Sequence, residues 1–342
     1  MTETIQTVEQ LEGVLSTPTR LVVEGLARLK GDMLFLGVGG KMGPALALMA
    51  RRGSEAAGTK REIIGVSRFS SPEHASKLKT HGIKTLVCDL LDEQEVNRLP
   101  EAPNVFFLAG MKFGSSDNQP LTWAMNSYLP ALICRKFRRS CMVALSTGNV
   151  YGLVPVTGKG AEESDAPAPL GEYAMSCLGR ERMFEYFSRK LEIPVTLVRL
   201  NYCCDLRYGV LVDLAQKIWS GEPVDLSMGH FNTIWQADAN AMILLSLLHA
   251  SCPPLVLNLT GPEVMSVRKV CEQFARLMRR EPRFIREEGS TALLSNAQKA
   301  FALFGRPRVG AAQLIGWVAD WIIRDRPTLG KPTHYESRHG KF

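Results

Sequence analysis

The stretch DMLFLGVGGKMG, residues 32–43, joins a short apolar run to a turn rich in glycine. The run is typical of a buried strand, and the residues that follow it, KMGPALALMARRG, are typical of a helix. Glycines between a strand and a helix let a phosphate approach the backbone, where the helix start offers N–H groups. The glycine spacing is GxxGxxG and not GxGxxG, and alone it is a weak signal. The position of these glycines after the first predicted strand favours a dinucleotide-binding turn.

Apolar runs of strand length alternate with helical patterns along the first part of the chain. This alternation predicts right-handed crossovers and a parallel, doubly wound sheet of the Rossmann type, in the α/β class. The pattern then becomes less regular, and amphipathic helices such as 310–325 indicate a smaller C-terminal α/β domain. After the first strand, further strands are predicted at 61–69, 83–90, 104–110, 141–147 and 194–202.

The chain is expected to divide into four segments. Residues 1–31 form a helical N-terminal extension, and residues 32–202 form the dinucleotide-binding Rossmann domain. Residues 203–325 form mainly the substrate-binding domain, although about 231–260 return to the Rossmann domain, and residues 326–342 are a polar C-terminal tail. The site is expected between the two domains, outside the carboxyl ends of the strands.

The composition is that of an ordinary soluble globular protein. Of 342 residues, 45% are hydrophobic and 22% are charged, and the formal net charge is +7. Because basic and acidic residues are interleaved, a solvated surface accounts for this charge, and a pocket for an anionic ligand such as a phosphate is the alternative. No block of Lys and Arg and no ladder of aromatic residues indicates nucleic-acid binding, so we expect no nucleic-acid partner.

The cysteine and hydropathy patterns predict a cytoplasmic protein. The eight cysteines include no CxxC pair and no His stands at metal-ligand spacing, so we expect reduced thiols and no metal site. The adjacent Cys203 and Cys204 are expected to pack in the core, with redox activity as the alternative. There is no signal-peptide pattern, and the longest apolar stretch, 241–250, is too short to span a bilayer, so we expect no membrane partner.

The end of the second predicted strand bears on the choice of cofactor. The sequence there is GVSRF, in which Ser67 and Arg68 are followed by no carboxylate until Glu73. A carboxylate would hold the ribose 2′-OH of NAD, whereas an arginine accommodates the 2′-phosphate of NADP. The sequence therefore favours NADP over NAD, unless Arg68 is a solvated surface residue or stacks on the adenine. Asp89, at the end of the third predicted strand, would bind the adenine amino group or cap the next helix.

Several motifs follow one another in a particular order. They are GVGGKMG, CDLLD, FLAGMKFG, the helix with Asn126, STGNVYG, the EESDAPAP loop and Tyr173. With this order and spacing, the chain resembles the NAD-dependent epimerase/dehydratase group of the extended short-chain dehydrogenases/reductases over about residues 32–325. It is similar to UDP-galactose epimerase and the nucleotide-sugar dehydratases. The resemblance implies a small, sugar-like substrate and a homodimer that pairs through the helices carrying Asn126 and Tyr173.

The resemblance also implies which residues contact the cofactor. Gly37, Gly40 and Gly43 would cradle the pyrophosphate. Ala109 would line the adenosine side, and Lys112 would contact the dinucleotide. The full predicted set is Gly37, Gly39, Gly40, Lys41, Met42, Gly43, Ser67, Arg68, Asp89, Leu90, Leu108, Ala109, Gly110, Lys112, Asn126, Tyr173 and Cys177.

Three residues are predicted to contact the substrate. Asn149 comes two residues after the threonine of STGNVYG, and Asn201 lies near the end of the sixth predicted strand. Arg207, in DLRYG, would bind an anionic or polyhydroxyl substrate, or it would be structural.

The resemblance assigns proton exchange to Tyr173 and places Thr147 at the reacting oxygen. Hydride transfer at a carbinol carbon needs a group that exchanges the hydroxyl proton, and a phenol with a pKa of about 10 is a poor base at neutral pH. A lysine one helical turn later would favour the phenolate, but the fourth residue after Tyr173 is Cys177. Arg180, on the same helix face, would supply part of this charge, or it is a solvated surface residue.

Two functions are consistent with these residues. The first is an NAD(P)-dependent oxidoreductase or epimerase that transfers hydride to or from a secondary alcohol or ketone of a sugar or sugar derivative. Its catalytic candidates are Tyr173, Thr147, Cys177 and Arg180. The alternative is a dinucleotide-binding regulatory or scaffold protein that has lost catalysis, because Cys177 offers no ammonium. Dehydration is disfavoured, because Gly148–Asn149 stands where the dehydratases of this group have Asp-Glu.

Overall fold

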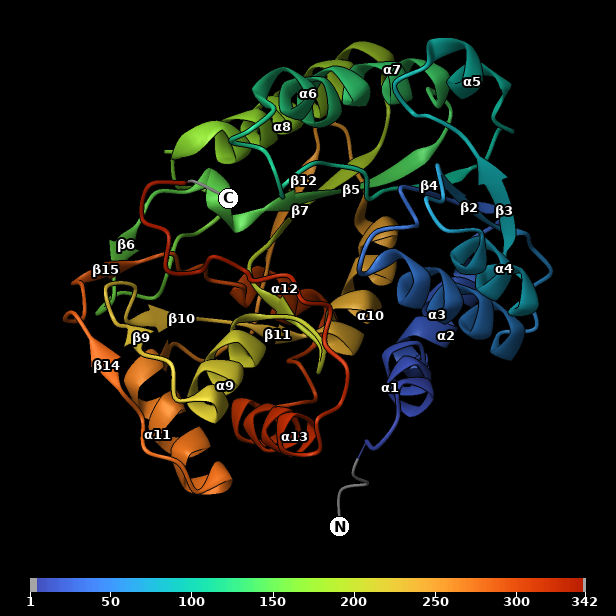
Figure 1. Cartoon of the computed structure of the whole chain (residues 1–342). Helices are drawn as coiled ribbons and strands as arrows, with labels where there is room; N and C mark the ends of the chain where they lie inside the picture. The colour runs from blue at the N-terminus through green and yellow to red at the C-terminus, as the bar shows by residue number, and fades with distance from the viewer. Residues whose placement is uncertain (1–4, 341–342) are drawn as a thin grey trace.

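A seven-stranded parallel sheet runs through the computed structural model, which describes residues 5–340 (Figure 1). Its strand order is β12-β7-β5-β4-β1-β2-β3, so the order reverses beside β1, where doubly wound folds bind ligands. The Rossmann fold predicted from the sequence is therefore confirmed. The strands are β1 (Met33–Leu36), β2 (Ile63–Ser67), β3 (Lys84–Val87), β4 (Asn104–Phe107), β5 (Cys141–Thr147), β7 (Val195–Leu200) and β12 (Leu255–Leu259).

Helices cover both faces of this sheet (Figure 1). On one face the helices pack on a core in which Phe35 and Phe106 stack with ring centroids 4.7 Å apart. These helices are α2 (Arg20–Arg28), α3 (Gly43–Ala56), α4 (Pro72–Thr80), α10 (Gln236–Ser246) and α12 (Gln298–Phe304). The other face carries α5 (Glu93–Arg98), α6 (Gln119–Trp123), η1 (Ala124–Tyr128), α7 (Leu129–Lys136) and α8 (Gly171–Leu191).

A second core lies beside the carboxyl ends of the strands. Three helices pack against one another there, α9 (Val210–Ser220), α11 (Val267–Met278) and α13 (Ala311–Ile323), and α1 (Val8–Leu15) of the N-terminal extension adds Leu11 and Leu15. Short strand pairs border them: β8 (Cys203–Cys204) with β11 (Ile234–Trp235), β9 (Val224–Asp225) with β14 (Phe284–Ile285), β10 (His230–Phe231) with β13 (Met265–Ser266), and β6 (Val154–Pro155) with β15 (Thr291–Ala292). The single turns η2 (Gly148–Val150) and η3 (Leu247–His249) complete the elements.

Two features bear on the kind of protein this is. Within residues 5–340, no helix combines the length and the apolar character needed to cross a bilayer. In the same part of the chain, no three His, Cys, Asp or Glu side chains gather as a set that would hold a metal ion.

A buried ion pair joins the sheet to its longest helix. Arg199 on β7 and Glu181 on α8 are 3% and 0% exposed, and Arg199 Nη2 lies 2.7 Å from Glu181 Oε2. Ser146 Oγ donates a hydrogen bond to Glu181 Oε1 (2.6 Å), and Arg199 Nη1 donates to Tyr151 Oη (2.6 Å). The pair therefore holds α8 against the ends of β5 and β7.

We expect the Arg199→Met substitution to lower the free energy of unfolding by about 3–5 kcal/mol, because it leaves the Glu181 carboxylate buried without a cation. Urea denaturation followed by circular dichroism measures this loss. The matched control is Arg182→Met on the same helix, which breaks an exposed pair with Glu185 and should cost less than about 1 kcal/mol. Equal losses in the two variants would contradict the prediction.

Candidate active site

The glycine turn between β1 and α3 packs tightly against its neighbours. Gly37 has φ of +87°, and a Cβ there would lie 2.7 Å from the backbone nitrogen of Ala109. A Cβ at Gly43 would lie 2.2 Å from the carbonyl oxygen of Val38, so neither position tolerates a side chain without movement of the backbone. The fourteen-residue helix α3 has no side-chain hydrogen bond at its N-cap, Met42, so the N–H groups of its first turn face the turn uncapped by a side chain. This cradle fits a diphosphate.

The other predicted cofactor residues follow neighbouring strands at the same edge of the sheet. Arg68, after β2, is exposed, and Asp89, after β3, accepts a hydrogen bond from Leu91 N (3.0 Å). The cap of helix α5 is Asp92, not Asp89, because Asp92 Oδ1 accepts from Gln94 N and Glu95 N. Ser67 is the last residue of β2 and precedes Arg68. Leu90 lies beside Asp89, and Leu108, Ala109 and Gly110 follow β4.

Asn126 lies beneath the site and does not face a ligand directly. It is fully buried, and its side-chain amide is hydrogen-bonded to both backbone groups of Met111 (2.9 Å each) and to Ser176 Oγ (2.9 Å). It therefore fastens the loop after β4 to α8. The sequence predicts that Asn126 contacts the cofactor, whereas these hydrogen bonds indicate that it positions the loop after β4 against α8.

Tyr173, on the first turn of α8, meets Thr147 at the end of β5. The side chains of Thr147 and Cys177 lie close enough to the Tyr173 hydroxyl to affect its pKa. Burial and the neighbouring Cys177 raise the pKa of this phenol, whereas the charge of Arg180 opposes the rise. The hydroxyl is therefore protonated at neutral pH. Asn149 completes the group, because its side-chain amide donates to Thr147 Oγ1 (3.2 Å).

Cys177 and Arg180 lie on the same face of α8 as Tyr173. Cys177 is fully buried, and burial raises the pKa of its thiol, so it carries no charge at neutral pH. Arg180 is 6% exposed, which rules out a solvated surface residue. Its guanidinium donates to Leu145 O (2.7 Å) and to Asn126 Oδ1 (2.6 Å), both neutral acceptors, so the charge of Arg180 lies close to Tyr173 without a carboxylate ion pair among residues 5–340.

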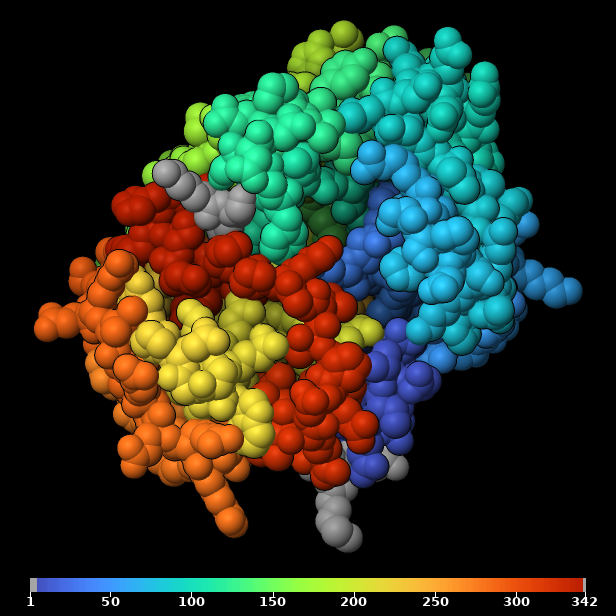
Figure 2. All heavy atoms as spheres, viewed as in Figure 1, coloured from blue at the N-terminus to red at the C-terminus, as the bar shows by residue number. Residues whose placement is uncertain are grey.

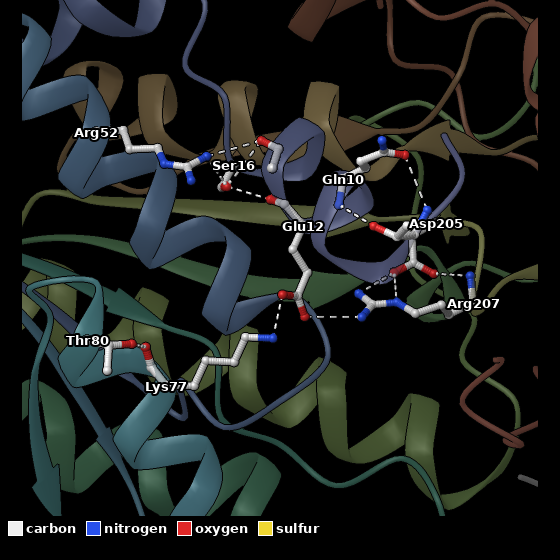
Figure 3. Close-up of polar contacts among 10 residues, drawn as sticks. Gln10, Glu12, Ser16, Arg52, Lys77, Thr80, Asp205 and Arg207 are labelled. Carbon is white, nitrogen blue, oxygen red and sulfur yellow. Dashed lines mark hydrogen bonds and ion pairs between the residues drawn. The ribbon is translucent and has the colours of Figure 1, made fainter. Parts of the chain in front are cut away.

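Asn201 and Arg207 are engaged in contacts within the protein. Asn201 is 2% exposed, and its amide donates to Asn232 Oδ1 (2.8 Å). Arg207 Nη2 lies 3.0 Å from Asp205 Oδ2, and Arg207 Nη1 lies 3.4 Å from Glu12 Oε1. Figure 3 shows Glu12 reaching from α1 to both Arg207 and Lys77. Arg207 therefore braces the N-terminal extension against the loop between β8 and α9.

Lys41 of the glycine turn lies between two aromatic rings that sequence reasoning did not select. Its Nζ is 3.1 Å from the ring centroid of Tyr208 and 4.0 Å from that of Phe113. Burial, together with the charges of Lys112 and Lys331, lowers the pKa of Lys41 to about 7. Phe113 follows Lys112 in FLAGMKFG, so this motif could have identified it as a site residue. No pattern in the sequence connects Tyr208 with Lys41 or Phe113.

Solved structures with the same fold include several sugar-nucleotide enzymes. MoeE5 in complex with UDP-glucose and NAD is 21% identical, with 86% of this chain and 99% of that chain covered and a TM-score of 0.70. UDP-glucose 4-epimerase from Thermotoga maritima with UDP-glucose is 17% identical, with 86% and 99% covered and a TM-score of 0.69. dTDP-glucose 4,6-dehydratase from Bacillus anthracis in complex with NAD is 16% identical, with 86% and 96% covered and a TM-score of 0.70. At these identities the likeness establishes the fold.

Sequence comparison identifies the family. No curated protein matches the chain in sequence. The family model described as the NAD dependent epimerase/dehydratase family matches residues 33–203, which is half of the chain and includes the glycine turn, Thr147 and Tyr173. The chain therefore belongs to the NAD-dependent epimerase/dehydratase family of enzymes, as the order of its motifs predicted.

Proposed function

We propose that the chain is an NAD(P)-dependent oxidoreductase or epimerase acting on a secondary alcohol or ketone of a sugar or sugar derivative. The observation that carries this proposal is the interaction of the Tyr173 hydroxyl with the side chain of Thr147, at the carboxyl end of β5. A proton donor and an orienting hydroxyl are the two groups that a carbonyl oxygen needs during reduction.

The residues present fit a nicotinamide dinucleotide. The glycine turn would hold its diphosphate against the uncapped start of α3, and Lys41 and Lys112 would add positive charge from either side. When bound, the nicotinamide supplies or accepts the hydride. The structures of MoeE5 and of the Bacillus anthracis dehydratase contain NAD, which supports a cofactor of this class.

Tyr173 would exchange the proton of the substrate hydroxyl while Thr147 orients the oxygen. Because burial keeps the phenol protonated, Tyr173 is suited to donate its proton as a carbonyl is reduced. Oxidation requires the reverse transfer, and it becomes easier as nearby positive charge stabilises the phenolate. Asn149, bonded to Thr147, would contact the substrate beside this oxygen.

Arg180 would take over part of the task of the missing lysine. Its charge lowers the pKa of both the Tyr173 hydroxyl and the Cys177 thiol, and its guanidinium is fixed by Asn126 and Leu145. A charge held by neutral acceptors keeps more of its effect on a neighbouring phenol than one paired with a carboxylate. Cys177 would act as a neutral hydrogen-bond partner of Tyr173.

The substrate would be a sugar nucleotide. MoeE5 and the Thermotoga maritima epimerase were solved with UDP-glucose, which supports this class for a chain with the same fold. Because Asn201 is bonded to Asn232 and Arg207 to Asp205 and Glu12, contact with the substrate at either residue would require these bonds to rearrange. Residues around Tyr173 would therefore carry most of the recognition.

The alternative is a dinucleotide-binding regulatory or scaffold protein without catalysis. The observation that favours it is the uncharged, fully buried thiol of Cys177 in the place of the lysine. In this case the glycine turn would still bind a dinucleotide, but the protein would not depend on the hydroxyl of Tyr173.

We further propose a cytoplasmic homodimer. Large apolar side chains are exposed on the helices that carry Asn126 and Tyr173: Trp123 is 38% exposed, Tyr128 53% and Met175 45%. A second copy covering these helices would remove that apolar surface from water. The cytoplasmic location stays a prediction that rests on the reduced cysteines.

Substitution of Tyr173 tests the proton step. Tyr173→Phe should lower the rate of nicotinamide reduction or oxidation about 10²–10⁴-fold, because the general acid is lost. Stopped-flow absorbance of the reduced nicotinamide, with a panel of sugar nucleotides, measures this rate. Tyr186→Phe is the control, because Tyr186 is exposed on the same helix and bonded to Lys190 four residues later (3.0 Å).

Cys177→Lys separates the two proposed functions in the same assay. If Arg180 already supplies the charge, the new ammonium is redundant or harmful in a buried position, and turnover should be unchanged or lower. Turnover that appears or rises in this variant would favour the protein without native catalysis.

The cofactor preference rests on Arg68. We propose that its exposed guanidinium binds the 2′-phosphate of NADP, so Arg68→Ala should weaken NADPH binding about tenfold and leave NADH binding unchanged. Fluorescence titration with each nucleotide measures both affinities. An equal change for the two nucleotides would reject a role in phosphate recognition, and tighter NADH than NADPH binding in the unmodified protein would reject the preference.

Dinucleotide affinity should fall as the pH rises through 7. Lys41 is protonated below its pKa of about 7 and neutral above it, so its attraction for the diphosphate weakens over this range. We expect NADH to bind about tenfold more weakly at pH 8.5 than at pH 6, as judged by fluorescence titration. Lys41→Met should reduce this dependence and leave the part due to Lys112, because burial lowers the pKa of Lys112 to about 8. Lys84→Met, at an exposed lysine on β3, should preserve the full dependence.

A further inference from the structure

The C-terminal strap, defined here as residues 327–340, runs along the cleft between the two domains. In Figure 2 it is the red segment that separates the green Rossmann side from the yellow and orange substrate domain. Leu329 N donates to Arg207 O (2.9 Å) where the strap enters the cleft. Lys331 then lies close enough to the glycine turn to lower the pKa of Lys41. The strap therefore follows the carboxyl ends of the strands, which is where ligands of doubly wound folds bind.

Thr333 fastens the middle of the strap to both sides of the cleft. On the substrate side, its backbone N and its Oγ1 donate to Asp213 Oδ2 on α9 (2.8 and 2.6 Å). On the Rossmann side, its carbonyl oxygen accepts from Lys112 Nζ (3.2 Å), which lies 6.0 Å from the ring centroid of Tyr173. Thr333 is 2% exposed, so the strap fills the space between Asp213 and Lys112.

The end of the strap packs against the start of α8. A Cβ at Gly171, two residues before Tyr173, would lie 2.3 Å from Gly340 O. Arg338 holds this end in place, because Nη1 donates to Ser227 O (2.9 Å) and Thr291 O (2.8 Å) and Nη2 donates to Thr291 Oγ1 (2.6 Å). A weaker contact joins Nη1 to Met228 Sδ at 3.9 Å.

We propose that the strap is a gate that occupies the cleft beside Tyr173 and must be released before a dinucleotide and a substrate can bind there. The proposal rests on the proposed function for the identity of the ligands, and it adds a regulatory step at the same site. The same hydrogen bonds that close the cleft span both domains, so their release would also let the domains separate.

The strap is attached in a way that permits release. It contains no helix or strand, and the side chains of Leu329, Lys331 and Pro332 are exposed. Tyr335 is its one large buried side chain, packed with its ring centroid 6.4 Å from that of Phe231. The Tyr335 hydroxyl is buried without a hydrogen-bond partner among residues 5–340, which weakens this anchor because water would satisfy the hydroxyl on opening. Segments with few buried contacts are the first to open locally.

The rate at which NADH binds tests whether the strap acts as a gate. In stopped-flow fluorescence, the observed rate should reach a plateau at high NADH concentration, set by strap opening. Arg338→Ala should raise the plateau about tenfold or more, because it removes the hydrogen bonds that hold the strap end. Arg324→Ala is the matched control, because its guanidinium pairs with Asp320 on the surface of α13, just before the strap, and it should leave the plateau unchanged.

A second variant and a second measurement keep the test valid if Arg338→Ala does not fold. Thr333→Val keeps the bonds of the Thr333 backbone but removes the hydroxyl bond to Asp213 and the one accepted from Tyr335 N, and it should also raise the plateau. Hydrogen exchange of residues 327–340 should increase when NADH and UDP-glucose are added. Rates that rise linearly with NADH in every variant, or exchange that slows on ligand addition, would overturn the gate. Gated binding without nicotinamide oxidation would instead reject the proposed function and leave the gate standing.

Discussion

The buried ion pair between Arg199 and Glu181 is the constraint on which the site depends. It links β7 to α8, and Glu181 also accepts a hydrogen bond from Ser146, which is the residue before Thr147. Removing two charges from water is costly, so such a pair serves position more than stability. Because both partners are held in one geometry, the start of α8 presents Tyr173 to Thr147 at the end of β5.

The positive charge around Tyr173 comes from several elements instead of one lysine. Arg180 acts on the phenol from α8, and Lys112, after β4, has its Nζ 6.0 Å from the ring centroid of Tyr173. Burial alone would leave the phenol inert as a base, and the charge of Arg180 acts against that effect. The cation nearest to Tyr173 along α8 is therefore Arg180, and position 177 carries a neutral thiol.

Segments near both ends of the described chain meet at Arg207. Glu12 of the N-terminal extension pairs with its guanidinium, and Leu329 of the strap donates to its carbonyl oxygen. The extension and the strap are thus joined to the same loop of the substrate domain, at the mouth of the cleft. Movement of the strap is therefore coupled to the relative orientation of the two domains.

The Rossmann fold, the family and the helix face that carries Tyr173, Cys177 and Arg180 could all be predicted from the amino-acid sequence. These features depend on local periodicity and short spacings, which a single sequence records directly. Three features could be seen only in the folded chain. Arg180 is buried, Arg207 pairs with a residue 195 positions away, and a polar tail crosses the cleft. Contacts of this kind join distant segments through hydrogen bonds and charge, and such segments have no period of their own from which the contact can be predicted.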